Sequence, residues 1–488
     1  MTSRIDTLFG TEVMPYRNRD TTVAIIGGGF TGAAVAWNLA NAGLAAPTSI
    51  VVFEPREKLG AGLAYDTRNP VHRINVPATR MSLDTSRPEQ FMAWLTAQDY
   101  LSTDPDALAA DGNLYPRRQA FGQYVYAQVE PYLRNGRIAH RRAEVERVTR
   151  TVDGRWRITA SDGQTLDADC VVIATSHPAP VAPRSLSNLL EGHPRYVPDA
   201  NAPHALASIR KTDSVLVVGN GLTSADVVAS LLAEGHQGSI LAISRRGLRS
   251  RGHAAVVQEL YGDFLTRPVT TARNLTKRIR EAISQARAQG LSWHAVLDAV
   301  RGQARDIWSN LSIDERRRLV RHLRPFWDVH RFRIAPQLEK ALDDARSRGQ
   351  FTSLAASIQA VAYHDSRIRV ALKAARRGGP LLRDVDAVIV TTGPAHGGVV
   401  GSQPFLAGMA EAGLIAADPI RLGLSCDHEA RILAADGQVI RGLFVAGPLA
   451  RGTFGELMGL PQVSDHARLV AEAVAAFMAE IRASDDAA

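Results

Sequence analysis

Residues 23–42 read VAIIGGGFTGAAVAWNLANA, an apolar run followed by a cluster of glycines and a run of small helix-forming residues. Gly27, Gly29 and Gly32 have the spacing Gly-x-Gly-x-x-Gly, and Phe30 and Thr31 lie between the last two glycines. The first glycine permits a tight turn, the second lets backbone approach a pyrophosphate, and the third lets the helix pack on the strand. The pattern predicts a strand, a helix over 32–42 and a second strand over 50–53, which form a dinucleotide-binding βαβ unit.

The second predicted strand of this unit ends at Glu54. A carboxylate at that position can accept hydrogen bonds from both ribose hydroxyls of an adenosine and repels a 2′-phosphate. The expected ligand is therefore FAD or NAD and not NADP. Glycines alone would also suit ordinary turns, but the strand, the helix and Glu54 together favour the nucleotide.

A second unit of the same kind covers residues 214–246. Its turn consists of Gly219, Asn220, Gly221, Leu222, Thr223 and Ser224. Ser224 replaces the third glycine and is small enough for close helix packing. Arg245 and Arg246 stand where the first unit has Glu54, and their guanidinium groups suit the 2′-phosphate of NADPH. The alternative is a solvated arginine pair at the end of a strand.

The rest of the chain predicts an α/β fold with two Rossmann-like domains and a helical insertion. Three further apolar strands end in small-residue turns, the last two at Gly393 and at Gly447 with Pro448, where chain would pass close to a nucleotide. An ordinary turn from a strand into a loop, without a nucleotide, would have a similar sequence. The predicted order is an arm over 1–20, an FAD-binding domain over 21–210 and 396–488, an NADPH-binding domain over 211–254 and 351–395, and a helical insertion over 255–350.

Helix formers and arginines dominate the predicted insertion. Amphipathic patterns predict helices over 276–289, 293–306 and 312–324. The basic stretch 321–333 could contact NADPH phosphates or an acidic substrate, and a solvated helix face is an equal alternative.

Composition narrows the class of protein. The chain has 488 residues, of which 45% are hydrophobic and 22% charged, as in globular proteins of two or three domains. A formal charge of +8 is mild, and no nucleic-acid-binding motif accompanies it. We expect neither a membrane span nor a secretory signal. Cys170 and Cys426 cannot form a disulfide framework, which suits a reducing cytoplasm, and no close His and carboxylate spacing predicts a metal site.

The motif order resembles that of the two-dinucleotide-binding flavoproteins, which include class B flavin monooxygenases, N-hydroxylases and disulfide reductases. A closer resemblance is to the FAD/NAD(P)-binding protein family typified by bacterial YdhS-like proteins. It is carried by Gly27–Gly32 with Glu54, Arg73–Pro77 with Arg80–Ser82, Tyr115–Arg118, Gly219–Asp226 with Ser244–Gly247, and Arg321–Pro336.

This resemblance implies that the first unit binds FAD and that Arg245 and Arg246 meet NADPH. It also implies that the segment Asn75–Ser82, with Arg80, Met81 and Ser82, lies beside the flavin and that Gly447–Gln462 closes over it. Ser176 and the segment 453–461 depart from the family pattern, which implies a different pocket over the flavin.

Two unlike nucleotide sites in one chain imply electron transfer from NADPH to FAD. We expect an NADPH-dependent monooxygenase in which reduced FAD and oxygen form a C4a-hydroperoxyflavin that hydroxylates nitrogen or sulfur of a small amine, amino acid or thiol. An oxidase or reductase acting on oxygen or a quinone, and a flavin-binding redox sensor, stay open. A disulfide reductase would need a thiol pair that the sequence lacks. The sequence leaves the oligomeric state open.

Asn75 and His253 are the candidate catalytic residues. The Asn75 amide can donate to a flavin or peroxide oxygen without releasing a proton, although a turn-forming asparagine is an equal alternative. His253 and His177 could assist proton transfer, although a structural or solvated histidine is the commoner case.

Overall fold

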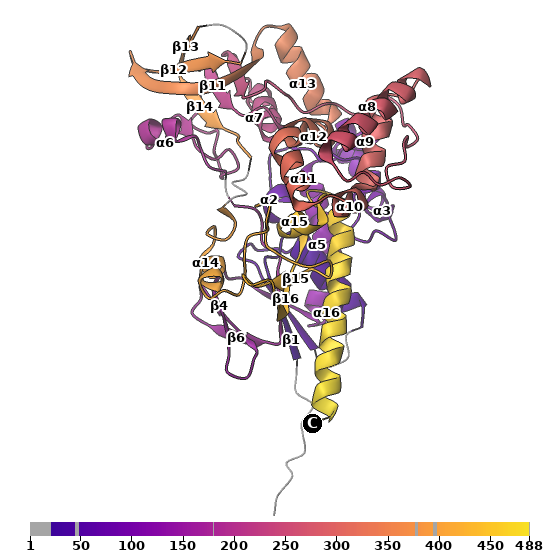
Figure 1. The fold of residues 1–488 in the computed structure, drawn as a ribbon. Coiled ribbons are helices and arrows are strands. Elements are labelled where there is room, and N and C mark those ends of the chain that lie inside the picture. The colour runs from indigo at the N-terminus through magenta and orange to yellow at the C-terminus, as the bar shows by residue number, and fades with distance from the viewer. Residues whose placement is uncertain (1–20, 44–47, 179, 376–378, 394–397, 488) are drawn as a thin grey trace, which may run out of the picture.

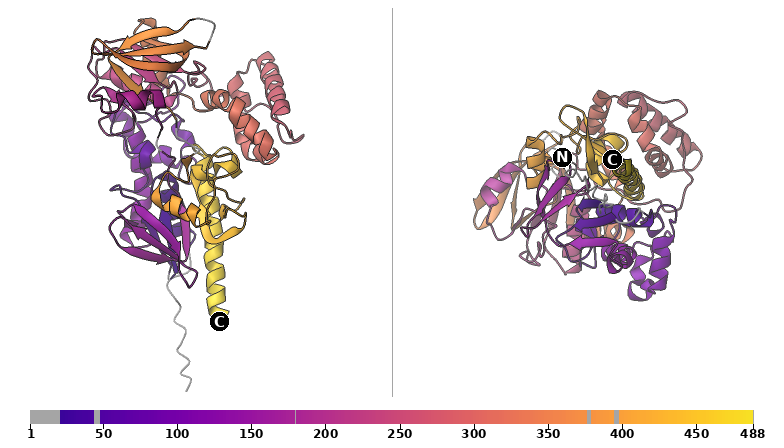
Figure 2. Two further views of the ribbon diagram at one scale, coloured as in Figure 1. Left: turned by 60° about the vertical axis from the view of Figure 1, so that its left-hand side comes forward. Right: turned by 90° about the horizontal axis from the view of Figure 1, so that it is seen from below.

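Figure 1 shows the computed structural model, which describes residues 21–43, 48–178, 180–375, 379–393 and 398–487. The predicted arm over 1–20 lies outside the described residues. Two mainly parallel sheets follow each other along the long axis, and a group of helices projects beside the second sheet (Figures 1 and 2).

The first sheet contains six strands in the order β15-β16-β7-β1-β2-β3. These strands are β1 (Thr21–Ile26), β2 (Thr48–Phe53), β3 (Ile138–Arg141), β7 (Cys170–Ile173), β15 (Arg431–Leu433) and β16 (Val439–Val445). All neighbours pair in parallel except β15, which runs antiparallel to β16. Val23 lies opposite Ile50 and Cys170, and all three side chains are buried, because helices cover a parallel sheet on both faces.

Helix α1 (Phe30–Asn41) packs against the long C-terminal helix α16 (Gln462–Ala487) and against α5 (Arg118–Arg134). The predicted first unit is therefore present, with the helix starting two residues earlier than expected. An antiparallel sheet of β4 (Val145–Arg150), β5 (Trp156–Ala160) and β6 (Thr165–Ala168) lies beside it.

Short elements connect these parts. They are α2 (Gly62–Tyr65), η1 (Ala78–Arg80), α3 (Gln90–Ala97), α4 (Tyr100–Thr103), η2 (Pro105–Ala107), α14 (Pro404–Glu411), η5 (Gly447–Ala450) and α15 (Arg451–Phe454).

The second sheet has seven strands in the order β13-β12-β11-β10-β9-β14-β8. They are β8 (Tyr196–Val197), β9 (Val215–Val218), β10 (Ile240–Ser244), β11 (Phe351–His364), β12 (Arg367–Ala374), β13 (Leu381–Val385) and β14 (Ala387–Val390). Strands β8 to β11 and β14 are parallel, whereas β11, β12 and β13 form an antiparallel meander. Strand β8, which precedes residue 211, thus joins the second sheet, together with α6 (Arg184–Leu190), which contacts β11.

Helix α7 (Leu222–Ala233) follows the second glycine turn and contacts α13 (Pro336–Ser347). Helix α13 leads into β11, which pairs in parallel with β10. It is thus the crossover helix of a βαβ connection, although it lies within the range 255–350.

The helices that project from the body are α8 (Ala272–Ala288), α9 (Trp293–Gly302), α10 (Ala304–Ser309), α11 (Ile313–Arg318), the π segment η3 (Leu319–Leu323) and α12 (Arg324–Arg331). The predicted helix 293–306 is divided after Gly302, a poor helix former. The predicted helix 312–324 continues to Arg331, and a π segment interrupts it just before Pro325, which has no backbone N–H for the helical ladder.

Candidate active site

The first glycine turn has the backbone that its sequence requires. Gly27 has φ +97°, and a Cβ there would lie 2.8 Å from the carbonyl oxygen of Ala174. A Cβ on Gly32 would collide with the carbonyl of Gly27, so no side chain fits between α1 and β1. The turn therefore brings the N-terminus of α1, with its free N–H groups, to the end of the sheet.

Glu54 closes this site at the end of β2. Its side chain is buried, and Oε2 accepts a hydrogen bond from the backbone N–H of Gly28 at 3.0 Å. Oε1 accepts bonds from the backbone and guanidinium of Arg56 at 3.2 and 3.0 Å. The carboxylate thus lies beside the glycine turn with lone pairs left for a ribose, which fits the adenosine of FAD.

Other predicted residues of the first site lie at or near the N-terminus of α1. A Cβ on Gly447, which has φ +71°, would collide with Thr31. The N–H of Gly447 donates to Nδ1 of the buried His466 at 3.1 Å, so the 447–448 turn with Pro448 is fixed against α16. Phe30 instead packs its ring on Tyr65 and Phe121, so its side chain belongs to the core.

The segment over 80–82 is held at the start of α16. Ser464 Oγ donates to the carbonyl of Ser82 at 2.8 Å, and Met81 is buried. The Ser82 hydroxyl closes its own turn by donating to the carbonyl oxygens of Asp84 and Arg87. The Ser82 hydroxyl proton is therefore already used within its own turn.

The second glycine turn leaves more room for a ligand. A Cβ on Gly219 would collide with Thr391, whereas a Cβ on Gly221 or Gly393 would meet no atom of the described residues within 4 Å. The Nδ2 of the buried Asn220 has no hydrogen-bond partner in the described chain. An open glycine and a buried amide without a partner fit a pyrophosphate at this turn. Ser224 is buried at the start of α7, as close packing on the strand requires, beyond Leu222 and Thr223.

Arg245 and Arg246 follow β10 and are exposed. Neither forms an ion pair within the part of the chain that the structure describes, and the Arg246 guanidinium lies over the Phe326 ring at 5.6 Å. The buried Ser244 Oγ beside them has no hydrogen-bond partner among the described residues. The strand end thus offers two exposed guanidinium groups, which suit the 2′-phosphate of NADPH.

A cavity of about 200 Å³ brings Asn75 and His253 together. His253 Nε2 lies 3.2 Å from the carbonyl oxygen of Asn75, and its ring packs on that of Tyr115 with centroids 5.1 Å apart. The Asn75 side-chain amide forms no hydrogen bond with the described residues and lines the cavity. Burial and the charge of Arg333 lower the pKa of His253 to about 4, so its neutral ring donates to the carbonyl at pH 7.

Positive charge predominates around this cavity, which we call the junction pocket. Its charged lining residues are Arg80, Arg301, Arg331, Arg333, Asp111 and Asp298. Arg333 forms a bidentate pair with Asp298 at 2.7 and 3.1 Å, and Arg331 pairs with Glu456. Arg80 is half-exposed, with a loose contact of 3.8 Å to Asp298. Burial and the charge of Arg331 lower the pKa of Arg301 to about 9, so it is still charged at pH 7.

His177 lies elsewhere, at the exit of β7. Its Nε2 is 3.0 Å from the sulfur of Met458, and burial with the charges of Arg451 and Arg324 lowers its pKa to about 4. It is therefore neutral at pH 7. The structure does not bring it into the junction pocket.

The thiols are unsuited to redox exchange. Cys170 and Cys426 are buried and free, and burial raises the pKa of both thiols, that of Cys426 to about 12. Both thiols therefore stay protonated at pH 7. A disulfide reductase needs a reactive thiolate, so these two residues do not suit that reaction. Within the described ranges no group of three or more His, Cys, Asp or Glu side chains could hold a metal ion, and no helix has the length and apolar character of a membrane span.

Sequence reasoning missed Asp298 and Arg301, and it placed Arg333 only in a basic stretch. Helix α9 carries the first two, and the charged positions 298 and 301 interrupt the otherwise apolar end of that helix. That spacing of three residues puts both side chains on one helix face. This pattern could have identified them in the sequence as candidate site residues.

Comparison with known proteins agrees with this architecture. Residues 24–178 match the family model described as FAD-NAD(P)-binding. No curated protein sequence matches the chain. Among solved structures, ornithine hydroxylase from Pseudomonas aeruginosa is 16% identical with a TM-score of 0.62, over 94% of this chain and 100% of that one.

Two further solved structures are similar over their full length. L-lysine 6-monooxygenase from Pseudomonas syringae is 17% identical with a TM-score of 0.62, over 95% of this chain and 99% of that one. Ornithine N-hydroxylase from Kutzneria sp. 744 is 17% identical with a TM-score of 0.58, over 94% of this chain and 99% of that one. The predicted α/β fold with two Rossmann-like units is confirmed.

Proposed function

We propose, from the premise that this chain has the fold of the two-dinucleotide-binding flavoproteins, that it is an FAD- and NADPH-dependent monooxygenase. Its substrate is a small molecule with a nucleophilic nitrogen or sulfur and a carboxylate, such as an amino acid. The junction pocket carries this proposal, because residues beside the first nucleotide site, the loop after β10 and the projecting helices all line it.

The two nucleotide sites differ as the two cofactors require. Glu54 at the first turn repels a 2′-phosphate and suits FAD, whereas the exposed Arg245 and Arg246 at the second favour NADPH. Bound FAD supplies the two-electron chemistry and the reaction with oxygen that side chains lack. The names of the similar enzymes, which hydroxylate ornithine or lysine, agree with an amine as the reacting group.

The residues of the junction pocket bind and orient the substrate. Arg80 and Arg301 offer positive charge to a carboxylate, and the unbonded Asn75 amide can donate to an oxygen at the reacting end. His253 is a positioning residue, since at neutral pH its ring fixes the loop onto Asn75 and carries no extra proton. We also place the chain in the cytoplasm, which suits two free thiols.

The purified protein tests this function directly. We expect flavin absorbance near 450 nm that NADPH bleaches under anaerobic conditions faster than NADH does. In air, an amino-acid substrate should stimulate NADPH oxidation and gain one oxygen atom by mass, and the matching amine without a carboxylate should do so poorly. Peroxide formed in equal amount to NADPH consumed, whatever substrate is added, would instead establish an oxidase.

A further inference from the structure

The projecting helices enclose a second cavity of about 430 Å³, which we call the insertion cavity. Its apolar lining includes Trp293, Trp308, Trp327, Phe326, Leu297 and Val300. Ligand pockets of this size are typically apolar with a few polar groups that fix orientation. The three tryptophans make the wall unusually rich in large flat side chains.

One end of the insertion cavity is charged. Arg451, at the start of α15, lines the cavity and is only 6% exposed, and its Nε and Nη1 have no hydrogen-bond partner among the described residues. Nearby, Arg324 pairs with Asp328 at 3.3 Å and Arg331 with Glu456 at 2.8 Å. Arg451 forms no such ion pair in the described chain, and burying a guanidinium without an anion is costly.

The insertion cavity is separate from the junction pocket. Glu456 lines the insertion cavity, its ion-pair partner Arg331 lines the junction pocket, and both side chains are buried. This pair forms part of the wall between them. Trp308 Nε1 donates to the carbonyl of Gly452 at 2.9 Å and fixes the charged end against the helices.

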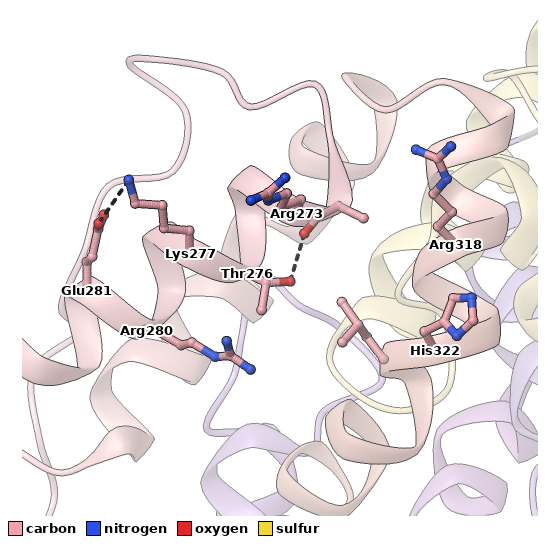
Figure 3. A pocket seen from close by; sticks show the side chains of 9 residues that line it. Arg273, Thr276, Lys277, Arg280, Glu281, Arg318 and His322 are labelled. Atoms are coloured by element: carbon pink, nitrogen blue, oxygen red, sulfur yellow. Dashed lines mark hydrogen bonds and ion pairs between the residues drawn. The ribbon is translucent and has the colours of Figure 1, made fainter.

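A basic surface cleft adjoins the insertion cavity and shares Thr276, Arg280 and Leu323 with it. Figure 3 shows Arg273, Lys277 and Arg280 on α8 facing the segment that carries Arg318 and His322. Lys277 contacts Glu281 at 3.7 Å, whereas Arg280 extends toward the facing segment. Such a cleft attracts an anion to the shared side of the cavity.

We infer that the insertion cavity binds an apolar carboxylate, with its hydrocarbon chain or ring system among the three tryptophans and its carboxylate paired with Arg451. The apolar walls favour the hydrocarbon part, and the buried Arg451, which lines the cavity and has no ion-pair partner among the described residues, supplies the positive charge for the carboxylate. This inference does not depend on the monooxygenase reaction, because it concerns a different cavity.

Calorimetric titration of the full-length, FAD-loaded protein with dodecanoate tests it, below the concentration at which micelles form. We expect saturable binding, and at least about tenfold weaker binding of dodecanol, since one charge-assisted hydrogen bond is lost. Arg451→Met should weaken dodecanoate binding by at least about tenfold for the same reason. Val300→Trp should abolish it by filling the cavity, whereas Arg287→Met, at an exposed arginine of α8, should leave it unchanged.

A second measurement needs no variant. Dodecanoate brominated at its last carbon should quench tryptophan fluorescence more than the same concentration of brominated acetate. Absent quenching, or no saturable binding by the parent protein, would overturn the inference. Unchanged dodecanoate binding by Arg451→Met would also overturn it, and would mean that Arg451 serves to balance the charge of Asp328. Loss of FAD from Arg451→Met would overturn it as well, and would mean that Arg451 contacts the flavin.

Discussion

His253 Nε2 lies 3.2 Å from the carbonyl oxygen of Asn75, so the loop that follows the second nucleotide unit is fastened to the segment beside the first. Both residues line the junction pocket, and Arg333, in the short link after α12, lies close enough to lower the pKa of His253. One hydrogen bond thus joins the parts of the chain that must cooperate if electrons pass from NADPH to a flavin.

Replacing His253 by Leu should release this loop. We expect kcat/KM for the substrate to fall about tenfold, the value of one hydrogen bond of ~1.4 kcal/mol. Peroxide formed per NADPH should rise, because the pocket excludes water less well. His364→Leu, near the turn between β11 and β12, is the matched control. If His253→Leu forms the same amount of peroxide per NADPH as the parent protein, His253 does not act as a positioning residue.

The double variant Arg245→Ala and Arg246→Ala tests the second nucleotide site. Loss of charge-assisted hydrogen bonds of about 1.5–3 kcal/mol should raise KM for NADPH roughly 10- to 100-fold. KM for NADH, which lacks the 2′-phosphate, should change little. Steady-state kinetics with both nucleotides provide the measurement, and an equal effect on both would show that the pair does not recognise the phosphate.

Glu54→Arg should weaken FAD binding. The change removes an acceptor for the ribose hydroxyls and for the N–H of Gly28 and places a cation in a buried site. Two lost charge-assisted bonds of ~1.5 kcal/mol each correspond to roughly 100-fold weaker binding. Flavin content after gel filtration measures this, with Glu57→Arg at an exposed neighbouring position as control. Equal retention of FAD by the parent and Glu54→Arg would contradict the role of this carboxylate.

Acid should destabilise the fold through its buried histidines. Burial, followed by the charge of Arg305, lowers the pKa of His466 to about 3, from an unfolded value of about 6.5. The folded state therefore binds fewer protons than the unfolded state between these values, and stability falls as pH drops from about 6.5 toward about 3. His466→Asn keeps an acceptor for the N–H of Gly447 but does not titrate.

Unfolding by urea at several pH values between 7 and 4 measures this contribution. The free energy of unfolding should fall less steeply with decreasing pH in His466→Asn, by up to about 1.4 kcal/mol per pH unit, the value of one proton. Identical slopes for the variant and the parent protein would mean that His466 is not buried in its neutral form.

Local patterns in the sequence predict much of this fold correctly. The apolar runs at β1 and β9, the glycine turns after them and the acid or arginines at the next strand end need only neighbouring residues to be recognised. Helix division was harder to predict, since Gly302 and Pro325 act within longer amphipathic patterns.

The sequence alone determined two strand, glycine-turn and helix units whose second strands end in opposite charges, because the backbone needs of a glycine turn and the charge at a strand end are properties of short segments. Only the tertiary structure decided that Asn75, His253 and Asp298 share one pocket and that Arg451 lies buried with no ion-pair partner among the described residues. Side chains far apart in the chain meet only when sheets and helices pack, and burial, which sets their pKa values and their need for partners, exists only in the folded protein.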